Sequence, residues 1–207
     1  FESLGGLVLY ADQIDAGQSD VTSALATTAA VQPDVVYLGL FEPEALVLVT
    51  QLRENDALAD AVLLGSDALL LDSFARSAGA AINNMYLSAP TAAGSGYDAF
   101  LQAWALRNEG SPQRAYGAFA YDATSILLNA LVDAAQLSGD ESMLIGRTRL
   151  RAAVAMTNTE SRVTGALACT AVGECAGQAT LGVFRLQDRE LPNSSWPPQR
   201  VWLPEED

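Results

Sequence analysis

Two loops of this sequence have side chains suited to holding a small molecule. Residues 39–42 include the aromatic ring of Phe41, and residues 65–67 end in the carboxylate of Asp67, which can pair with an ammonium group. A third loop, residues 88–91, follows another apolar run. Ligands of open parallel sheets bind at loops beyond the carboxyl ends of the strands. These loops are therefore the first candidates for a binding site.

Each of these side chains also has an ordinary structural interpretation. Phe41 stands two residues before Pro43 and can pack as a hydrophobic staple at a helix start. Asp67 follows Gly and Ser, so it can serve as a turn residue or a helix cap. Tyr116 and Tyr121 are more typical of a core than of a ligand site. The pattern alone leaves both interpretations open.

The composition argues against catalysis. The chain has no His, and all eleven of its basic residues are Arg, so it also has no Lys. It therefore lacks the side chain that titrates near neutral pH and the amine that forms Schiff bases. Ser66 and Asp67 have no His to complete a hydrolase, and no Gly-X-Ser-X-Gly elbow is present. We expect a protein that is not an enzyme and needs neither a cofactor nor a metal.

The charge excludes two further classes of partner. The chain has 25 acidic and 11 basic residues, a net charge of −14, which repels nucleic-acid phosphates and anionic membrane surfaces. No stretch approaches the roughly 20 continuous apolar residues of a membrane span. The start at Phe1, without Met or a signal peptide, is typical of a chain cut from a longer one.

The two cysteines, Cys169 and Cys175, lie close together with Gly173 between them. This spacing suits a small disulfide at a hairpin tip better than a metal site, which needs more ligands. The alternative is a pair of reduced thiols in a cytosolic loop. A disulfide would indicate an oxidising compartment, periplasmic or extracellular.

The first part of the chain alternates strand-like and helix-like segments. Ser19 or Asp20 can cap the first helix, and Pro43 between two glutamates predicts the start of the second. The expected strands are residues 7–10, 35–38, 61–64 and 84–88, the last ended by Pro90, and the expected helices are 21–31, 42–55 and 72–81. This rhythm predicts an α/β fold with a parallel sheet flanked by helices.

Beyond Tyr97 the pattern becomes helical and then rich in strands. Tyr97, Phe100 and Trp104 recur at helical spacing. The expected helices start at residue 97 and cover 116–137 and 143–156, and the expected strands are 165–169, 179–186 and 200–203.

Five stretches together resemble a known family. They are FESLGGLVLYADQI, PDVVYLGLFEPEALVLVTQLRE, VLLGSDALLLDSF, YDAFLQAWALRNEGSPQRAYGAFAYDATSILLNALVDA and VTGALACTAVGECAGQATLGVFRL. In this order they resemble the C-terminal two-thirds of the solute-binding proteins of branched-chain amino-acid ABC transporters, which have the type I periplasmic-binding fold. The Tyr-Asp-Ala helix and the Gly-rich C-terminal hairpin are the most specific of the five.

The resemblance implies two α/β lobes that close on a ligand by hinge motion. It divides the chain into a C-terminal-lobe segment (1–89), a helical segment that returns to the N-terminal lobe (90–160), and hinge and C-terminal strands with the cysteine hairpin (161–207). The family's N-terminal lobe would lie upstream of Phe1, together with the loops that grip a ligand carboxylate. The chain would then hold about half of a binding site and bind poorly by itself.

The same resemblance implies a role for each candidate side chain. Asp67 would receive the ligand's ammonium group, with Ser66 beside it in the loop. Phe41 would form an aromatic wall, Leu40 would face an apolar pocket, and Tyr116 would face the cleft between the lobes.

The implied function is extracytoplasmic binding of a small amino acid or amide and its delivery to the membrane permease of an ABC transporter. The alternative is a ligand-sensing ectodomain of a signalling protein. Apolar surface left open by the missing segments would also allow the chain to self-associate.

Overall fold

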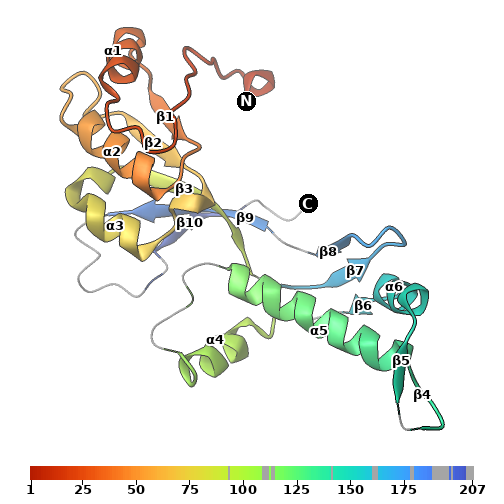
Figure 1. Cartoon of the computed structure of the whole chain (residues 1–207). Helices are drawn as coiled ribbons and strands as arrows, with labels where there is room; N and C mark the ends of the chain where they lie inside the picture. The colour runs from red at the N-terminus through yellow and green to blue at the C-terminus, as the bar shows by residue number, and fades with distance from the viewer. Residues whose placement is uncertain are drawn as a thin grey trace. The chain divides into compact units, whose positions relative to one another are not determined.

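The computed structural model describes residues 1–92, 94–108, 112, 115–140, 142–159, 163–177, 180–187, 196 and 198–203 (Figure 1). The chain forms two compact units. Unit 1 comprises Phe1–Ala89 and Gly182–Asp207, and unit 2 comprises Pro90–Leu181.

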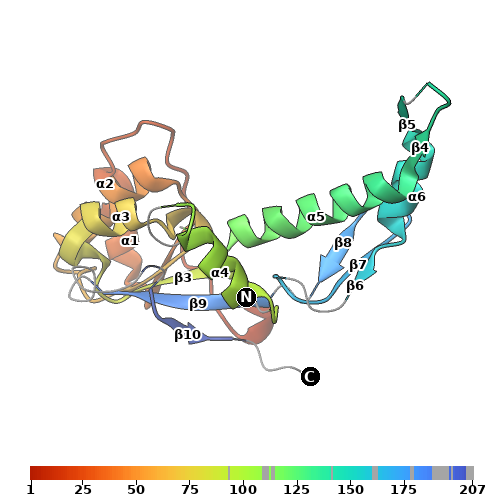
Figure 2. The same ribbon diagram turned by 90° about the horizontal axis from the view of Figure 1, so that it is seen from below.

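A five-stranded sheet with the order β1-β2-β3-β9-β10 forms the centre of unit 1 (Figure 1), and Figure 2 shows its strands β3, β9 and β10 from below. Strand β2 pairs in parallel with both β1 and β3, and β10 pairs antiparallel with β9. The helices are α1 (Thr22–Val31), α2 (Glu42–Arg53) and α3 (Asp72–Ala78), with short 3-10 helices at Glu2–Leu4, Asp67–Leu69 and Gly79–Ile82. The strands are β1 (Val35–Leu38), β2 (Val62–Gly65), β3 (Met85–Thr91), β9 (Thr180–Leu186) and β10 (Arg200–Trp202). The last two residues of β3 and the first two of β9 belong to unit 2. This architecture confirms the predicted α/β class.

The hydrophobic core of unit 1 joins the sheet to all three α-helices. Leu63 and Leu87 from the strands and Phe74 from α3 are completely buried in one cluster, to which α1 adds Leu25 and α2 adds Leu52. Strand β3 alternates buried and half-buried residues along its length, as expected of a strand covered more fully on one face. Burial of these side chains gives unit 1 a core of its own.

Strand β1 is not buried on both faces, although strands of parallel sheets commonly are. Its side chains Val35 and Tyr37 are 49% and 60% exposed, because β1 lies at the edge of the sheet. Only Leu38 at its end is fully buried.

Two other predictions for unit 1 are wrong. Residues 7–10 form no strand: in the part of the chain that the structure describes they pair with no neighbour, and Leu7 is 72% exposed. Strand β3 does not stop before Pro90 but continues to Thr91. Proline removes only one backbone donor and keeps an extended chain, so a strand can pass through it where that donor is not needed.

Unit 2 combines helices with two small antiparallel sheets. Its helices are α4 (Tyr97–Ala105), α5 (Tyr116–Ala134) and α6 (Arg147–Ala155), and α5 packs against α6. Its strands are β4 (Ala135–Leu137), β5 (Met143–Ile145), β6 (Asn158–Thr159), β7 (Leu167–Cys169) and β8 (Cys175–Gly177). Strands β4 and β5 form a hairpin, and β6, β7 and β8 form a sheet in that order.

The β4–β5 hairpin replaces the ends of two predicted helices. Helix α5 stops at Ala134 instead of continuing to residue 137, and residues 143–145 are strand instead of the first turn of α6. The cause is the turn between them, where the Asp140 carboxylate accepts hydrogen bonds from the Ser138 hydroxyl (2.6 Å) and the Ser142 backbone N–H (3.1 Å). This local bonding favours a turn over a continued helix.

Among the described residues, no helix is both long enough and apolar enough to span a membrane.

Candidate functional site

Two of the three predicted ligand loops, residues 39–42 and 65–67, begin at one edge of the unit 1 sheet, whereas residues 88–91 are not a loop but the end of β3. At this edge Leu38 of β1 pairs with Gly65 of β2, and Gly65 pairs with Leu87 of β3. The bonding continues into the loop after β2, because the Ser66 backbone N–H donates to the Leu38 carbonyl at 3.3 Å. Within the sheet, the Ser88 hydroxyl of β3 donates to the Gly65 carbonyl of β2 at 3.5 Å. The carboxyl ends of β1 and β2 therefore meet beside β3, at the kind of position where ligands of open α/β sheets bind.

Gly65 is closely packed at this edge. A Cβ atom at Gly65 would lie 2.7 Å from the Leu87 Cδ2 atom, closer than real Cβ contacts, and 3.0 Å from the Leu69 Cδ1 atom, so these leucine side chains would have to shift. The missing side chain lets the loop that contains Asp67 turn back tightly over the sheet.

Phe41 immediately precedes α2 and presents its ring to solvent. Its backbone is extended, its carbonyl accepts the Ala45 N–H at 3.0 Å, and its side chain is 75% exposed. Such exposure favours the aromatic-surface interpretation of Phe41 over a buried staple. Leu40 behaves differently, because it is half-buried and packs against the core of unit 1.

Asp67 is the first residue of a 3-10 turn. Its backbone carbonyl accepts the Leu70 N–H at 3.0 Å, and the carbonyl of Ser66 accepts the Leu69 N–H at 3.1 Å. Both Ser66 and Asp67 are half-buried. The turn interpretation of Asp67 is therefore correct for its backbone, and its ligand role stays a prediction.

A second carboxylate at this edge was not predicted as a site residue. Glu42 begins α2, and its Oε2 atom accepts a hydrogen bond from the Ser73 hydroxyl at 3.0 Å, which ties the start of α2 to the start of α3. The acidic helix start was visible in the sequence, but the contact with Ser73, 31 residues away, was not.

Tyr116, the remaining predicted ligand residue, belongs to unit 2. It is the first residue of α5, it is 47% exposed, and its ring centroid lies 6.4 Å from that of Phe119. Its predicted role at the ligand stays a prediction.

A hollow of about 470 Å³ lies at the opposite end of the sheet, around Arg53. Asp60 and Asn84 in its lining stand just before β2 and β3. The Arg53 guanidinium donates to four backbone carbonyls, those of Ala59, Ala61, Ala81 and Asn83, at 2.6–3.2 Å. Burial lowers the pKa of Arg53 from its ordinary value. We interpret Arg53 as a structural residue and not a ligand-binding one, since its guanidinium N–H groups already donate to backbone carbonyls.

Asp122 of the Tyr-Asp-Ala stretch is buried and hydrogen-bonded to Thr164 inside unit 2. It is 2% exposed, and its Oδ2 atom accepts hydrogen bonds from both the backbone N–H (2.8 Å) and the hydroxyl (2.9 Å) of Thr164. This pair attaches α5 to the segment before β7. Tyr121 beside it is 55% exposed, and its ring lies 5.7 Å from that of Phe100, so it is not the core aromatic that its spacing suggested.

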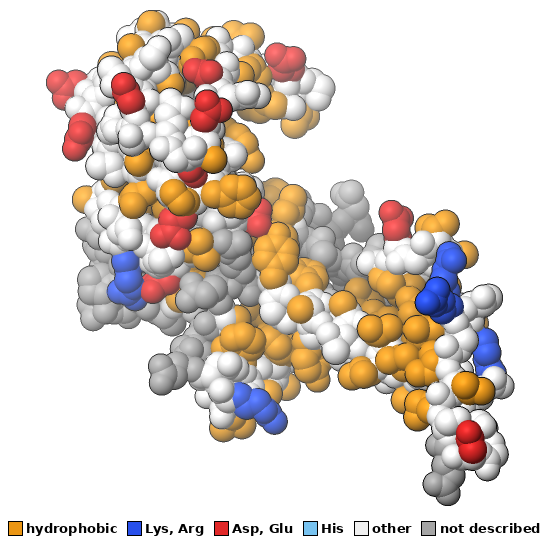
Figure 3. All heavy atoms as spheres, in the orientation of Figure 1, with side chains coloured by type: hydrophobic (Ala, Val, Ile, Leu, Met, Phe, Trp, Pro, Cys, Tyr) orange, Lys and Arg blue, Asp and Glu red, His pale blue; other side chains and the backbone are white. Residues whose placement is uncertain are grey.

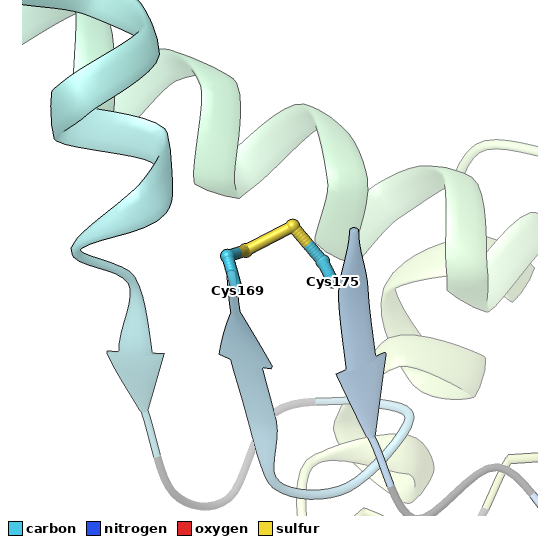
Figure 4. The surroundings of a disulfide bond; sticks show 2 residues. All are labelled: Cys169 and Cys175. Atoms are coloured by element: carbon cyan, nitrogen blue, oxygen red, sulfur yellow. A yellow bond between two sulfur atoms is a disulfide. The ribbon is translucent and has the colours of Figure 1, made fainter. Parts of the chain in front are cut away.

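Cys169 and Cys175 form a disulfide across the β7–β8 hairpin (Figure 4). The two residues are directly paired across the strands, which confirms the predicted bond at a hairpin tip. No group of three His, Cys, Asp or Glu side chains that could hold a metal ion occurs in the described ranges.

Comparison with solved structures shows the same fold in proteins about twice as long. The leucine-binding protein LivK of Thermotoga maritima has a TM-score of 0.72 and 17% identity, over 92% of this chain and 50% of its own. LivJ of Streptococcus pneumoniae, solved with isoleucine, has a TM-score of 0.68 and 20% identity, over 92% and 51%. A solute-binding protein of R. palustris, solved with benzoate, has a TM-score of 0.70 and 20% identity, over 98% and 52%.

The chain thus spans about half the length of these structures. None of the curated proteins matches its sequence. A family model described as periplasmic binding protein matches residues 1–185. Since this match covers most of the chain, which also has the fold of solved solute-binding proteins, the chain belongs to the periplasmic binding protein family.

Proposed function

We propose that this chain is the ligand-binding part of a non-catalytic, extracytoplasmic solute-binding protein that delivers a small amino acid or amide to an ABC-transporter permease. The observation that supports this most directly is the family match over residues 1–185. In unit 1, the loops after β1 and β2 supply Phe41 and Asp67 at the edge where ligands of parallel sheets bind.

The charge of this edge favours a ligand with an ammonium group. Glu42 and Asp67 place two carboxylates there, while residues 39–42, 65–72 and 88–92 contain no Arg or Lys. A carboxylate that meets an ammonium group in a partly dry site forms a charge-assisted hydrogen bond, stronger than its surface equivalent. Asp67 is therefore the proposed ammonium acceptor, with Ser66 beside it.

The exposed ring of Phe41 is the proposed contact for the apolar part of the ligand. Aromatic faces bind aliphatic and aromatic groups over a large area. Leu40 fixes the chain next to Phe41, because it packs against the core of unit 1.

Aromatic carboxylates are the second candidate ligand class, since similar solved structures from R. palustris hold benzoate or 4-hydroxybenzoate. Phe41 suits the aromatic ring of such a ligand. The carboxylates of Glu42 and Asp67 do not suit its carboxylate group, because like charges repel. The two classes therefore predict opposite effects of removing the charge of Asp67.

The disulfide supports a location outside the cytoplasm. A bond between Cys169 and Cys175 persists in oxidising surroundings such as the periplasm or cell exterior, in line with the family to which the chain belongs.

The test is a titration of the ¹⁵N-labelled chain with leucine, isoleucine, benzoate and 4-hydroxybenzoate. Ligand at about 10 mM detects binding with a Kd of about 1 mM, the weak range expected of a chain that spans half of its relatives' length. We expect leucine or isoleucine to shift the backbone amide signals of Phe41, Ser66 and Asp67.

Asp67→Asn should remove the response to amino acids and leave or strengthen any response to benzoate. Asp34→Asn is the matched control, since Asp34 is exposed just before β1, at the opposite end of that strand. Benzoate shifts that Asp67→Asn strengthens would favour the second class. Shifts confined to residues outside 39–42, 65–67 and 88–91 would refute the site.

A further inference from the structure

Two carboxylates in the first turn of α2 differ from most other acidic side chains of unit 1. Between residues 1 and 89 the acidic side chains are mostly exposed, and Figure 3 shows several of them on the surface of unit 1. Glu42 and Glu44 are half-buried instead, and each accepts a hydrogen bond from a residue far away in the sequence. Their carboxylates therefore link α2 to other parts of unit 1.

Glu44 holds a tight turn against the start of α2. Its Oε1 atom accepts the Gly17 backbone N–H at 2.7 Å, the short distance of a charge-assisted bond, and this bond lowers the pKa of Glu44. Gly17 has a φ of +80°, which glycine adopts without steric cost. The turn is closed by the Gln18 N–H, which donates to the Asp15 carbonyl at 3.0 Å. Glu44 thus fixes a turn that is already ordered by its own bonds.

The same segment meets unit 1 at two further points. Ile14, just before the turn, packs against the core. Gln51 stands two helical turns after Glu44, on the same face of α2, and its Nε2 atom donates to the Ser19 carbonyl at 3.4 Å. The segment therefore lies along α2, and Glu44 makes the contact nearer to the start of the helix.

Glu42 links α2 to the segment that carries Asp67. Its Oε2 atom accepts the Ser73 hydroxyl of α3 at 3.0 Å. Only a short connection separates α3 from the 3-10 turn that Asp67 begins, and Leu69 and Leu70 anchor that connection in the core. Helix α2 also packs against both α3 and this 3-10 turn. The bond from Ser73 to Glu42 therefore ties the start of α2 to the loop of Asp67.

Phe41 stands directly before these two carboxylates. Its carbonyl accepts a backbone hydrogen bond from α2, so its backbone is fixed to the first turn of the helix. Two side chains bind one ligand well only if their separation is set in advance. We propose that Glu42 and Glu44 are positioning residues, which hold this turn between α3 and residues 15–18 and so set the place of Phe41 relative to Asp67. This inference rests on the proposed function.

The alternative is that both glutamates only favour the start of a helix, because carboxylates interact with the positive end of the helix dipole. In that case their charge matters and their bonds do not. Ser73→Ala separates the two explanations, because it removes the bond to Glu42 and leaves every charge at this edge unchanged. Ser77→Ala is the matched control, since Ser77 is exposed on the same helix.

The first measurement is the leucine titration of the ¹⁵N-labelled chain, repeated with these two variants. Ser73→Ala should raise the leucine Kd about fivefold, the effect of losing one hydrogen bond to a charged group. Ser77→Ala should bind leucine like the wild type. The circular-dichroism spectra of both variants should match that of the wild type.

The second measurement, amide hydrogen exchange at Gly17, needs no ligand. In Glu44→Ala the exchange rate should rise at least about tenfold, because the Gly17 N–H loses its acceptor. In Glu44→Gln it should stay within about threefold of the wild-type rate, because the glutamine side-chain oxygen can accept the same bond. An effect of the helix dipole alone would be equal in the two variants, since both remove the charge.

Two results would overturn the positioning role and leave the proposed function intact. One is a leucine Kd that Ser73→Ala does not change, and the other is a Gly17 exchange rate that Glu44→Ala does not change. If the wild-type chain bound none of leucine, isoleucine, benzoate and 4-hydroxybenzoate, the proposed function and the positioning role would fall together.

Discussion

Unit 1 and unit 2 are held together in different ways. In unit 1, side chains from the sheet and all three α-helices join one buried cluster. In unit 2, neither α4 nor α6 has a fully buried residue, and most of the residues that α5 buries are alanines. Unit 2 is stabilised instead by specific bonds: the Asp122–Thr164 hydrogen bonds, the disulfide and the hydrogen bonds of the β4–β5 turn. A unit with its own core tolerates the loss of a polar contact, whereas a unit built on such contacts does not.

Removing a core aromatic should give the largest effect. Phe74 is completely buried in unit 1, so Phe74→Ala should lower the free energy of unfolding by about 3–5 kcal/mol. Met156 in unit 2 is 81% exposed, and Met156→Ala should change it by less than about 0.5 kcal/mol. Urea denaturation followed by circular dichroism measures both. Similar losses in the two variants would contradict the difference between the units.

Removing the buried hydrogen bonds between Asp122 and Thr164 should give the second-largest loss of stability. Asp122→Ala leaves the backbone N–H and the hydroxyl of Thr164 buried without their acceptor, at a cost of about 2–3 kcal/mol. Amide hydrogen exchange at Thr164 should accelerate accordingly. Asp133→Ala, an exposed change on the same helix, is the control and should leave that exchange rate unchanged. Unchanged protection in Asp122→Ala would mean that packing alone holds α5 in place.

Breaking the disulfide should have a somewhat smaller effect. The bond joins residues only six positions apart, so it should contribute about 2 kcal/mol by restricting the unfolded chain. Replacing Cys169 and Cys175 with serine should increase hydrogen exchange in β7 and β8 and leave β1 and β2 unchanged. If exchange in the unit 1 sheet rose equally, the hairpin would be part of the same cooperative unit.

The smallest effect should be a pH response in the β4–β5 turn. Hydrogen bonds from Ser138 and Ser142 lower the pKa of Asp140 to about 2. A lowered pKa means that the ionised form stabilises the fold, so this contribution is complete above pH ~4 and is lost as the pH falls through about 2. The Ser142 amide signal should report this titration in NMR spectra. In Asp140→Asn the transition should be absent; its persistence would assign the titration to another group.

Local signals in the sequence predicted the elements of unit 1 well. Glu42 and Pro43 fixed the first turn of α2, and the strand at residues 35–38 was predicted with its observed bounds. Phe41 and Asp67 could be assigned to one edge because parallel strands end together. For the first helix, the N-cap residue is Val21 instead of the predicted Ser19 or Asp20, although the Asp20 carboxylate accepts the Thr22 N–H.

The remaining features depend on contacts between distant residues. Residues 7–10 have the composition of a strand. A strand also needs a neighbouring strand to pair with, and the sequence of the segment alone does not reveal whether one is present. The Met143 segment shows helical spacing, yet the Asp140 turn places it in a hairpin. The bond between Glu42 and Ser73 forms only after α2 and α3 have packed, so no motif could reveal it.

The bond from the Ser66 N–H to the Leu38 carbonyl also bears on the energetics of recognition. It extends the sheet's bonding by one residue into the loop, so the backbone beside Asp67 is ordered before any ligand arrives. A ligand at this edge would therefore restrict mainly the side-chain rotamers of Phe41 and Asp67, at a conformational-entropy cost of about 0.5–1.5 kcal/mol each. Loosening this bond would add the cost of ordering the backbone at Ser66 to the cost of binding.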